Sequence, residues 1–230
     1  MRHPFLFCSV LIVMILCLSP SAYSNENPAP AHIELASSHS ENASYQNALL
    51  QDLQTAYFAE VVESELYQAF AGKAEEEGYK GVASLFRALS KAEEIHSIKR
   101  ATLIQQYGGS PEKPSEPIQV GTTIENLDWS IEAESYEENF MYPDYKTFAD
   151  QASPADIAHE SALSECYDYC VKAEIVHTEL LQDARKNLKA YQDADTGFMV
   201  CPRCGNIMRS QGSDFCTKCA IPKKDFITIR

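Results

Sequence analysis

Two pairs of glutamate and histidine at the same spacing are the residues of this sequence best suited to catalysis. Glu93 and His96 lie three residues apart in KAEEIH, and Glu174 and His177 lie three residues apart in KAEIVH. Residues three apart share one face of a helix, so each pair can direct both side chains the same way. Carboxylate oxygens with one imidazole per site suit two iron or manganese ions that share carboxylates. The matching contexts also indicate an internal duplication of a helix pair.

Two other segments with helical periodicity carry further carboxylates. Glu134 and Glu137 are three residues apart in IEAESYEEN, and Glu60 lies on an apolar stripe with Val61 and Phe70. Among 33 acidic residues, a single E-x-x-E is more often a solvent-exposed face, and a single E-x-x-H more often forms a surface salt bridge. The combination of two matching E-x-x-H pairs with these carboxylates favours a two-metal site.

The cysteines suggest a second kind of metal site. Four of the eight form two C-x-x-C turns near the C-terminus: Cys201, Cys204, Cys216 and Cys219. Such a set makes a tetrahedral four-thiolate site that suits zinc or a single iron. Disulfides are the alternative if the protein is exported, but paired C-x-x-C turns suit metal geometry better. Cys166 and Cys170 lie four residues apart, and we interpret them as small buried hydrophobic residues, with a redox or accessory metal role as the alternative.

Apolar residues at three- and four-residue spacings predict four helices that would position these side chains. The helices are expected from about Ala43 to Gly78, onward to about Tyr107, from Thr123 to about Ala152 with a kink at Pro143, and from Ser153-Pro154 to about Tyr191. Tight links make the first two and the last two antiparallel pairs. The connection at 108–122 extends to about 50 Å, enough to run along a helix of about 45 Å. We therefore predict a mainly α, ferritin-like four-helix bundle with one long crossover.

The N-terminus has the pattern of a secretory signal peptide at residues 1–24. A basic start precedes an apolar run from Phe5 to Leu18, and the small residues Ala22 and Ser24 precede the expected cleavage point. The run is shorter than the roughly 20 residues of a membrane-spanning helix, so we expect an exported, periplasmic protein, attached to a membrane only if the signal is uncleaved. Residues 25–42 are polar and contain proline, which predicts a flexible lead-in.

Composition limits the classes of function. The net charge of −14 excludes a nucleic-acid binder, which would need concentrated positive charge, and 45% hydrophobic residues suffice for a packed core. We predict a bundle at 43–192 and a separate small cysteine unit at 197–230. His32, His39 and His159 lie away from the candidate ligands and receive no role.

From about Ala48 to the C-terminus the sequence resembles the rubrerythrin family. The similarity lies in AYFAEVVESELYQAFAGKAEEEGY, in TIENLDWSIEAESYEENFMYPDY, and in the FMVCPRCG opening and IPKKDFITI close of a rubredoxin-like four-cysteine domain. The sequence departs from the family at Ala59-Glu60-Val61, where Gly-Glu-Ser is common, and in a slightly shorter loop between the C-x-x-C turns. The resemblance favours iron over zinc at the cysteines. It also implies a di-iron site with seven ligands: Glu60, Glu93, His96, Glu134, Glu137, Glu174 and His177.

The resemblance also implies a function. It indicates a non-haem di-iron peroxidase that reduces hydrogen peroxide to water in oxidative-stress defence, with electrons delivered through the four-cysteine iron. Glu137 and His96 match the positions that exchange as ligands of one iron between oxidation states. The resemblance further implies a homodimer, in which the rubredoxin-like domain of one subunit faces the di-iron site of its partner. Candidate residues lining the site, with core packing as the alternative, are Tyr57, Tyr67, Tyr136 and Tyr142.

Export affects the expected electron donor, and two functions other than a peroxidase fit the sequence. An exported enzyme would not meet cytosolic NADH, so we expect its electron donor to be a small redox protein or a membrane-linked carrier. The main alternative is a ferroxidase that oxidises and handles ferrous iron on the same bundle. A non-enzymatic electron-transfer module with a vestigial bundle is the other alternative, and the intact ligand set argues against it.

Overall fold

The computed structural model of the chain describes residues 34–113, 115, 117–151, 160–192 and 197–229. The described residues from Ser40 onward belong to one compact unit, which holds every candidate ligand. The predicted signal peptide at 1–24, the helix start at Ser153-Pro154, and the residues His32 and His159 lie outside the described residues. Within the described part of the chain, no helix combines the length and apolarity needed to cross a membrane.

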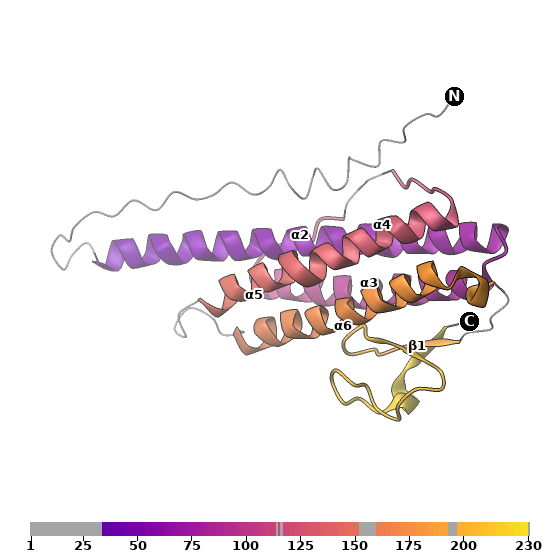
Figure 1. Cartoon of the computed structure of the whole chain (residues 1–230). Coiled ribbons are helices and arrows are strands. Elements are labelled where there is room, and N and C mark those ends of the chain that lie inside the picture. The colour runs from indigo at the N-terminus through magenta and orange to yellow at the C-terminus, as the bar shows by residue number, and fades with distance from the viewer. Residues whose placement is uncertain (1–33, 114, 116, 152–159, 193–196, 230) are drawn as a thin grey trace. The chain divides into compact units, whose positions relative to one another are not determined.

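Four long helical segments form a bundle, as the apolar spacing predicts (Figure 1). A short link at Gly78, whose φ of +85° suits glycine, joins the first two segments, and residues 107–122 form the long crossover between the second and third. The architecture is therefore the ferritin-like one predicted from the connection lengths. The segments are α2 (Glu34–Glu76), α3 (Lys80–Gln106), the run of α4 (Thr123–Tyr136), η1 (Glu137–Met141) and α5 (Tyr142–Asp150), and α6 (Glu160–Lys186).

Two helix ends differ from the predicted ones. Helix α2 begins at Glu34, so it overlaps the lead-in predicted at 25–42. Helix α6 ends at Lys186, and a short 3-10 helix, η2 (Leu188–Tyr191), follows where a continuous helix was expected. The break falls at Asn187, whose φ of −116° and ψ of 35° are not helical. Apolar periodicity continues through such a break, which is why it did not reveal the end of the helix.

The third helical segment contains a wide turn where a kink was predicted. Between α4 and α5, η1 is a π-helix in which the Tyr142 N–H donates to the carbonyl of Glu137, five residues earlier. Pro143 follows directly and has no N–H to continue an α-helical ladder, so the wider turn accommodates it. A π-turn rotates the side chains around it relative to an α-helix, and such turns often occur at functional sites. Here it carries Glu137, one of the predicted ligands.

The cysteine unit is a small antiparallel sheet packed over α3 and α6. Its strands are β1 (Phe198–Val200), β2 (Ile207–Arg209) and β3 (Ile227–Ile229), in the order β2-β1-β3, and a 3-10 turn, η3 (Lys223–Asp225), precedes the last strand. Phe198, Val200 and Ile207 join the same apolar cluster as residues of the bundle helices. The sheet is therefore anchored on the bundle through apolar contacts.

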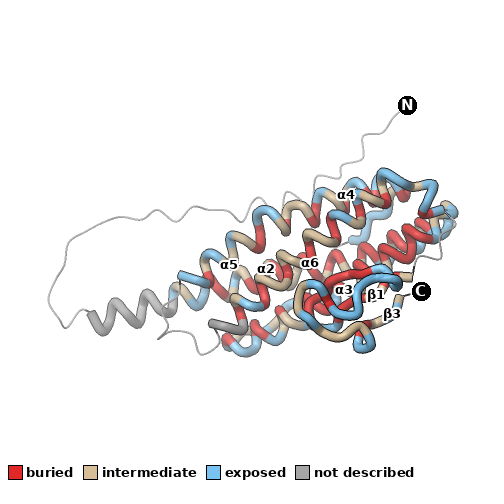
Figure 2. Tube along the Cα trace, turned by 60° about the horizontal axis from the view of Figure 1, so that its bottom comes forward, coloured by how far each residue is buried: buried red, intermediate tan, exposed pale blue. Residues whose placement is uncertain are grey.

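The bundle interior has two apolar clusters with a charged layer between them. Along α2, the first cluster includes Leu49 and Leu53, the second includes Phe70 and Ala74, and the buried Glu60 lies between. Helices α3 and α6 also carry residues of both clusters, toward opposite ends of each helix. Figure 2 shows the buried faces of these helices. Removing carboxylates from water is costly unless cations or hydrogen bonds compensate. A buried layer of carboxylates therefore marks a functional site.

Candidate metal centres

All seven predicted ligands of the bundle meet in this charged layer, and each is at most 1% exposed. Four helical segments supply them. Helix α2 carries Glu60, α3 carries Glu93 and His96, and α6 carries Glu174 and His177, while Glu134 and Glu137 come from the end of α4 and the start of the π-turn. The three-residue spacing therefore places each pair on the inner face of its helix.

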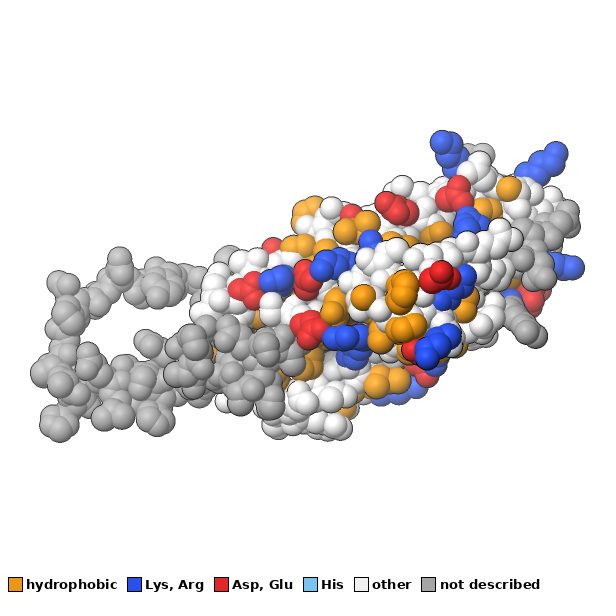
Figure 3. Space-filling view, turned by 90° about the horizontal axis from the view of Figure 1, so that it is seen from below, with side chains coloured by type: hydrophobic (Ala, Val, Ile, Leu, Met, Phe, Trp, Pro, Cys, Tyr) orange, Lys and Arg blue, Asp and Glu red, His pale blue; other side chains and the backbone are white. Residues whose placement is uncertain are grey.

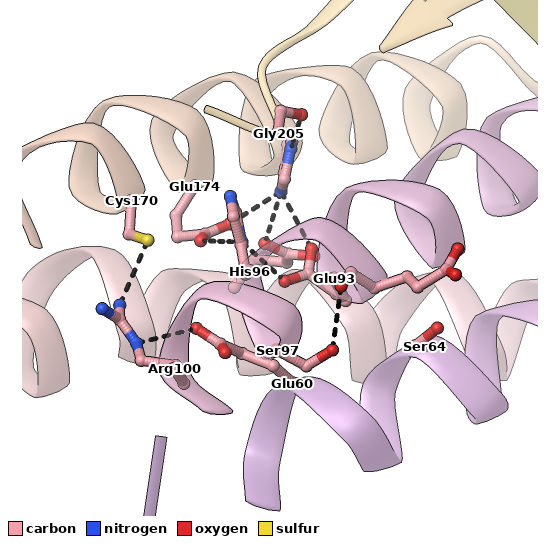
Figure 4. Close-up of polar contacts among 12 residues, drawn as sticks. Glu60, Ser64, Glu93, His96, Ser97, Arg100, Cys170, Glu174 and Gly205 are labelled. Atoms are coloured by element: carbon pink, nitrogen blue, oxygen red, sulfur yellow. Dashed lines mark hydrogen bonds and ion pairs between the residues drawn. The ribbon is translucent and has the colours of Figure 1, made fainter. Parts of the chain in front are cut away.

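Glu93 and Glu174 each contact the Nδ1 atoms of both His96 and His177. Figure 4 shows the two carboxylates beside His96. The Nδ1 atom of His96 is 2.9 Å from one oxygen of Glu93 and 3.2 Å from one oxygen of Glu174. The Nδ1 atom of His177 is 3.3 Å from the other oxygen of Glu93 and 2.7 Å from the other oxygen of Glu174. Each carboxylate thus directs one oxygen to each half of the site, which is the arrangement of carboxylates shared by two metal ions.

The polar atoms of the site fit metal ions better than they fit one another. Within the described residues, both oxygens of Glu137 and the Oε2 atom of Glu60 are buried and have no hydrogen-bond donor. Ligand atoms that lie within 4.8 Å of one another form three groups: Glu93, Glu134, Glu174 and His177; Glu60, His96 and Cys170; and Glu63, Glu93 and Glu137. Buried acceptors without donors require a cation, and two iron ions supply it.

The pKa values of these carboxyl groups show the same need for a cation. Burial raises the pKa of Glu60 to about 7 and that of Glu134 to about 8, against the attraction of nearby His and Arg charges. Burial would also raise the pKa of Glu174, but the positive charges of His96 and His177 outweigh it and lower that pKa below its usual range. Without metal, the site therefore retains protons that metal ions displace on binding.

Two of the four candidate tyrosines contact ligands. The Tyr67 hydroxyl donates to Glu134 Oε1 over 2.7 Å, and the Tyr142 hydroxyl donates to Glu60 Oε1 over 2.6 Å. Tyr57 and Tyr136 are partly buried against the apolar cluster at the α5 end of the bundle, which corresponds to the core-packing alternative. The two buried hydroxyls each fix the orientation of one carboxylate, as partners of metal ligands commonly do.

Two functional residues were missed by the sequence analysis. Glu63 is 3% exposed and directs a carboxylate into the site one helical turn after Glu60. The fully buried guanidinium of Arg100 lies with Nε 3.3 Å from Glu60 Oε1. Glu63 lies three residues after Glu60, the same spacing as in the predicted ligand pairs, so the sequence did contain a signal for it. Arg100 gave no such signal, because a basic residue in a helix is usually solvated.

Arg100 also accounts for the two unassigned cysteines. Its guanidinium donates to Cys166 Sγ over 3.0 Å and to Cys170 Sγ over 3.1 Å, and it lies between the rings of Tyr142 and Tyr167. Both cysteines are buried, as expected of small hydrophobic residues. Their sulfur atoms nevertheless accept hydrogen bonds from a cation, so they take part in the polar layer.

The four C-terminal cysteines converge on one point, as predicted. Their sulfur atoms all lie within 4.8 Å of one another, with Cys201 and Cys219 3.4 Å apart and Cys204 and Cys216 3.5 Å apart. These distances are longer than the roughly 2 Å of a disulfide and match the edges of a four-thiolate metal site. All four are free thiols, three of them buried.

The two metal centres are in contact through the backbone of the first cysteine turn. The Nε2 atom of His96 lies 3.1 Å from the carbonyl oxygen of Cys204, and that of His177 lies 3.3 Å from the carbonyl oxygen of Gly205. A carbonyl only accepts, so each Nε2 carries the donating hydrogen and each Nδ1 faces the carboxylates as a metal ligand. A Cβ on Gly205 would lie 2.2 Å from His96 Nε2, so only glycine allows this approach.

The chain's own cysteine unit makes this contact. The Lys99 ammonium donates to the Arg203 carbonyl, and Arg203 pairs with Glu165 over 2.7 Å, so polar contacts flank the junction. Positive and negative side chains are interspersed on this face of the molecule (Figure 3). The resemblance implied that a partner's domain would face the site. In this structure the domain of the same chain occupies that position, and the homodimer stays a prediction.

A ferritin-like bundle with a shared-carboxylate cluster and an attached four-thiolate site defines a class of non-haem di-iron proteins. Comparison with known proteins agrees, because the family model described as Rubrerythrin matches residues 52–185. The chain belongs to the rubrerythrin family. It therefore holds a di-iron site in the bundle and a rubredoxin-like iron site at the four cysteines.

Curated relatives cover most of the chain. Rubrerythrin-2 of Clostridium acetobutylicum is 27% identical over 186 residues, which are 80% of this chain and 98% of that protein. Nigerythrin of Nitratidesulfovibrio vulgaris is 30% identical over 182 residues, which are 77% of this chain and 84% of that protein.

Solved structures show the same fold. Nigerythrin in a mixed-valence state matches with a TM-score of 0.70 and 29% identity, covering 78% of this chain and 86% of that one. A bacterioferritin of Desulfovibrio desulfuricans matches with a TM-score of 0.56 and 14% identity, covering 66% of this chain and 86% of that one. The second match is a likeness of fold alone.

Proposed function

We propose that this protein is a non-haem di-iron peroxidase that reduces hydrogen peroxide to water, with electrons supplied through its four-cysteine iron. The oxidoreductase class follows from the family, and the observation that carries the finer proposal is the contact between the two centres. His96, a ligand in the bundle, donates to the carbonyl of Cys204, a ligand of the other iron, over 3.1 Å. An electron can therefore pass between the centres without leaving the protein.

The di-iron pair, when bound, supplies two electrons and polarises the O–O bond as a Lewis acid. Reduction of one peroxide to two waters also consumes two protons, and these must come from groups in the buried layer. The Tyr142 hydroxyl donates to Glu60 Oε1 over 2.6 Å, and the Tyr67 hydroxyl donates to Glu134 Oε1 over 2.7 Å. These two buried hydroxyls are the proposed proton donors.

The contact of His96 with the Cys204 carbonyl also suits stepwise delivery of electrons. A four-thiolate iron at the cysteines would supply one electron at a time, so two transfers would be needed for each peroxide. The enclosure of the site supports a small substrate, because all seven predicted ligands are at most 1% exposed. Hydrogen peroxide is small enough to enter such a site.

The location and partners of the enzyme form part of the same proposal. We propose export to the periplasm, on the sequence of residues 1–24, and a small redox protein or a membrane-linked carrier as electron donor. We also propose a homodimer. A secreted pool of peroxidase would then remove peroxide before it reaches the cytosol.

A turnover assay with an artificial donor tests the proposal. Iron-loaded protein should consume hydrogen peroxide while it oxidises a photoreduced flavin, with two electrons used per peroxide and no dioxygen released. Cys216→Ser should abolish donor-driven turnover while a chemically reduced bundle still reacts once with peroxide. A ferroxidase would instead oxidise and store many ferrous ions per chain without needing the donor, and that outcome would replace the proposal.

A further inference from the structure

We propose that Glu63 is an additional ligand of the di-iron centre, beyond the seven residues that the family resemblance assigns. This proposal depends on the di-iron site and not on the peroxidase activity. Glu63 lies three residues after the ligand Glu60, so both side chains leave the same face of the helix. Glu63 is 3% exposed, which is the burial of a site residue and not of a solvated glutamate.

The neighbours of Glu63 are other carboxylates. An oxygen of Glu63 lies with one from Glu93 and one from Glu137 in a group whose members are all within 4.8 Å of one another. Its Oε2 atom has no hydrogen-bond partner, and both oxygens of Glu137 also lack one. Among the described residues, no Lys, Arg or His forms an ion pair with Glu63. Glu93 pairs with His96 and His177. Among the described residues, neither Glu63 nor Glu137 has such a partner, so two of the three buried carboxyl groups lie together without a positive charge beside them.

A metal ion near these oxygens would balance their negative charge, and the predicted di-iron site places such an ion among the neighbouring ligands. Glu93 and Glu137 belong to the di-iron set, so an iron held by both lies where a Glu63 oxygen can also reach it. The alternative is that Glu63 stays protonated and shares its proton with Glu137. In that case Glu63 contacts a ligand but forms no bond to iron.

A further carboxylate changes the charge balance of the centre. With Glu63 the buried layer holds six carboxylates and one guanidinium, from Glu60, Glu63, Glu93, Glu134, Glu137, Glu174 and Arg100. Two ferric ions carry six positive charges and two ferrous ions carry four, so the added negative charge stabilises the ferric pair more. Glu63 should therefore lower the reduction potential of the di-iron centre.

The direct test is the crystal structure of the iron-loaded wild-type protein, which needs no variant. An oxygen of Glu63 bonded to iron supports the proposal. A Glu63 carboxyl that instead hydrogen-bonds to Glu137, with both its oxygens beyond bonding distance of either iron, overturns it.

Mössbauer spectroscopy of Glu63→Gln gives a second test, with Glu65→Gln as the matched control on the same helix. Glu65 is part-exposed and pairs with Lys113 over 2.9 Å, away from the charged layer. We expect Glu63→Gln to change the isomer shift or quadrupole splitting of one iron and to raise the midpoint potential, or to lose that iron while circular dichroism shows a folded chain. Glu65→Gln should do neither. A wild-type spectrum and potential in Glu63→Gln, with two irons retained, would overturn the proposal.

Discussion

The Nε2 atom of His96 lies 3.1 Å from the carbonyl oxygen of Cys204, so a predicted ligand of the di-iron site contacts the backbone of a predicted ligand of the four-cysteine site. The carbonyl holds the ring in one orientation and leaves Nδ1 for metal. The same bond is a direct link between the two redox centres. The packing of the cysteine unit on α3 and α6 therefore joins the two predicted metal centres and is not only part of the fold.

The first prediction concerns Gly205, which permits this contact. Gly205 has a φ of +71°, and a Cβ there would overlap His96. Gly205→Ala should displace the first cysteine turn and slow electron transfer between the centres by at least roughly tenfold, since misplacements of about 1 Å can have such effects. Stopped-flow absorbance of the four-cysteine iron measures the rate. Gly72→Ala is the control, because a Cβ at Gly72 in α2 meets no atom within 4 Å, and the rate there should be unchanged.

The second prediction concerns the hydroxyl of Tyr142. Its hydrogen bond to Glu60 over 2.6 Å lowers the pKa of that carboxyl group, against the larger effect of burial that raises it to about 7. Tyr142→Phe should therefore raise the pKa of Glu60 further. Since iron binding displaces the proton, the pH of half-maximal iron loading should move upward. Tyr145→Phe serves as the aromatic control, and an unshifted loading curve in Tyr142→Phe would contradict the proposed role of the hydroxyl.

The third prediction is a pH dependence of the metal-free protein. Glu60 and Glu134 have folded pKa values of about 7 and about 8 because of burial, both above the usual 4.5. A group whose pKa is raised on folding favours the folded state most at low pH, and this contribution is lost as the pH rises through the folded pKa. The free energy of unfolding should thus fall between about pH 4.5 and 8, by on the order of 3 kcal/mol from Glu60 alone.

Chemical denaturation at several pH values measures this effect. Loading with iron or zinc should remove most of the loss, because the metal compensates the carboxylate charges. If the free energy of unfolding of the metal-free protein instead rose steadily from pH 5 to 8, burial would not raise the pKa values of these carboxyl groups.

The fourth prediction concerns Arg100. Its guanidinium is fully buried, pairs with Glu60 and donates to two cysteine sulfurs. Arg100→Met should destabilise the iron-loaded protein by about 3–5 kcal/mol, the typical effect of removing one partner from a buried ion pair. Cys166→Ala removes only one hydrogen bond and should cost less. Denaturant unfolding of the two variants gives the comparison, and equal losses would mean that the charge of Arg100 is not the source of its effect.

Much of the fold and the site could be predicted because it follows local spacing. The four helices and the crossover were predicted from apolar periodicity and connection length, and the structure and the solved structures that it matches confirm them. The four-cysteine cluster came from the C-x-x-C turns and is also confirmed. The Glu93–His96 and Glu174–His177 pairs meet as expected, because a three-residue spacing fixes one helix face.

What could not be predicted depends on contacts between elements. Pro143 indicated a kink, but only the packed structure shows that the chain forms a π-turn, which carries Glu137. Arg100 resembles a surface residue until its partners on α2 and α6 are known. The approach of Gly205 to His96 joins residues far apart in the sequence, and no local pattern reports it. Glu63 was hidden among many acidic residues, although its spacing from Glu60 was available.

The most direct test of the account is a single-turnover comparison of two oxidants. Fully reduced, iron-loaded protein should be mixed anaerobically with hydrogen peroxide, or with an equal concentration of dioxygen, while the spectra of both iron centres are followed. We expect peroxide to reoxidise the protein much faster than dioxygen does. Reoxidation by peroxide at the same rate as dioxygen, or more slowly, would contradict it.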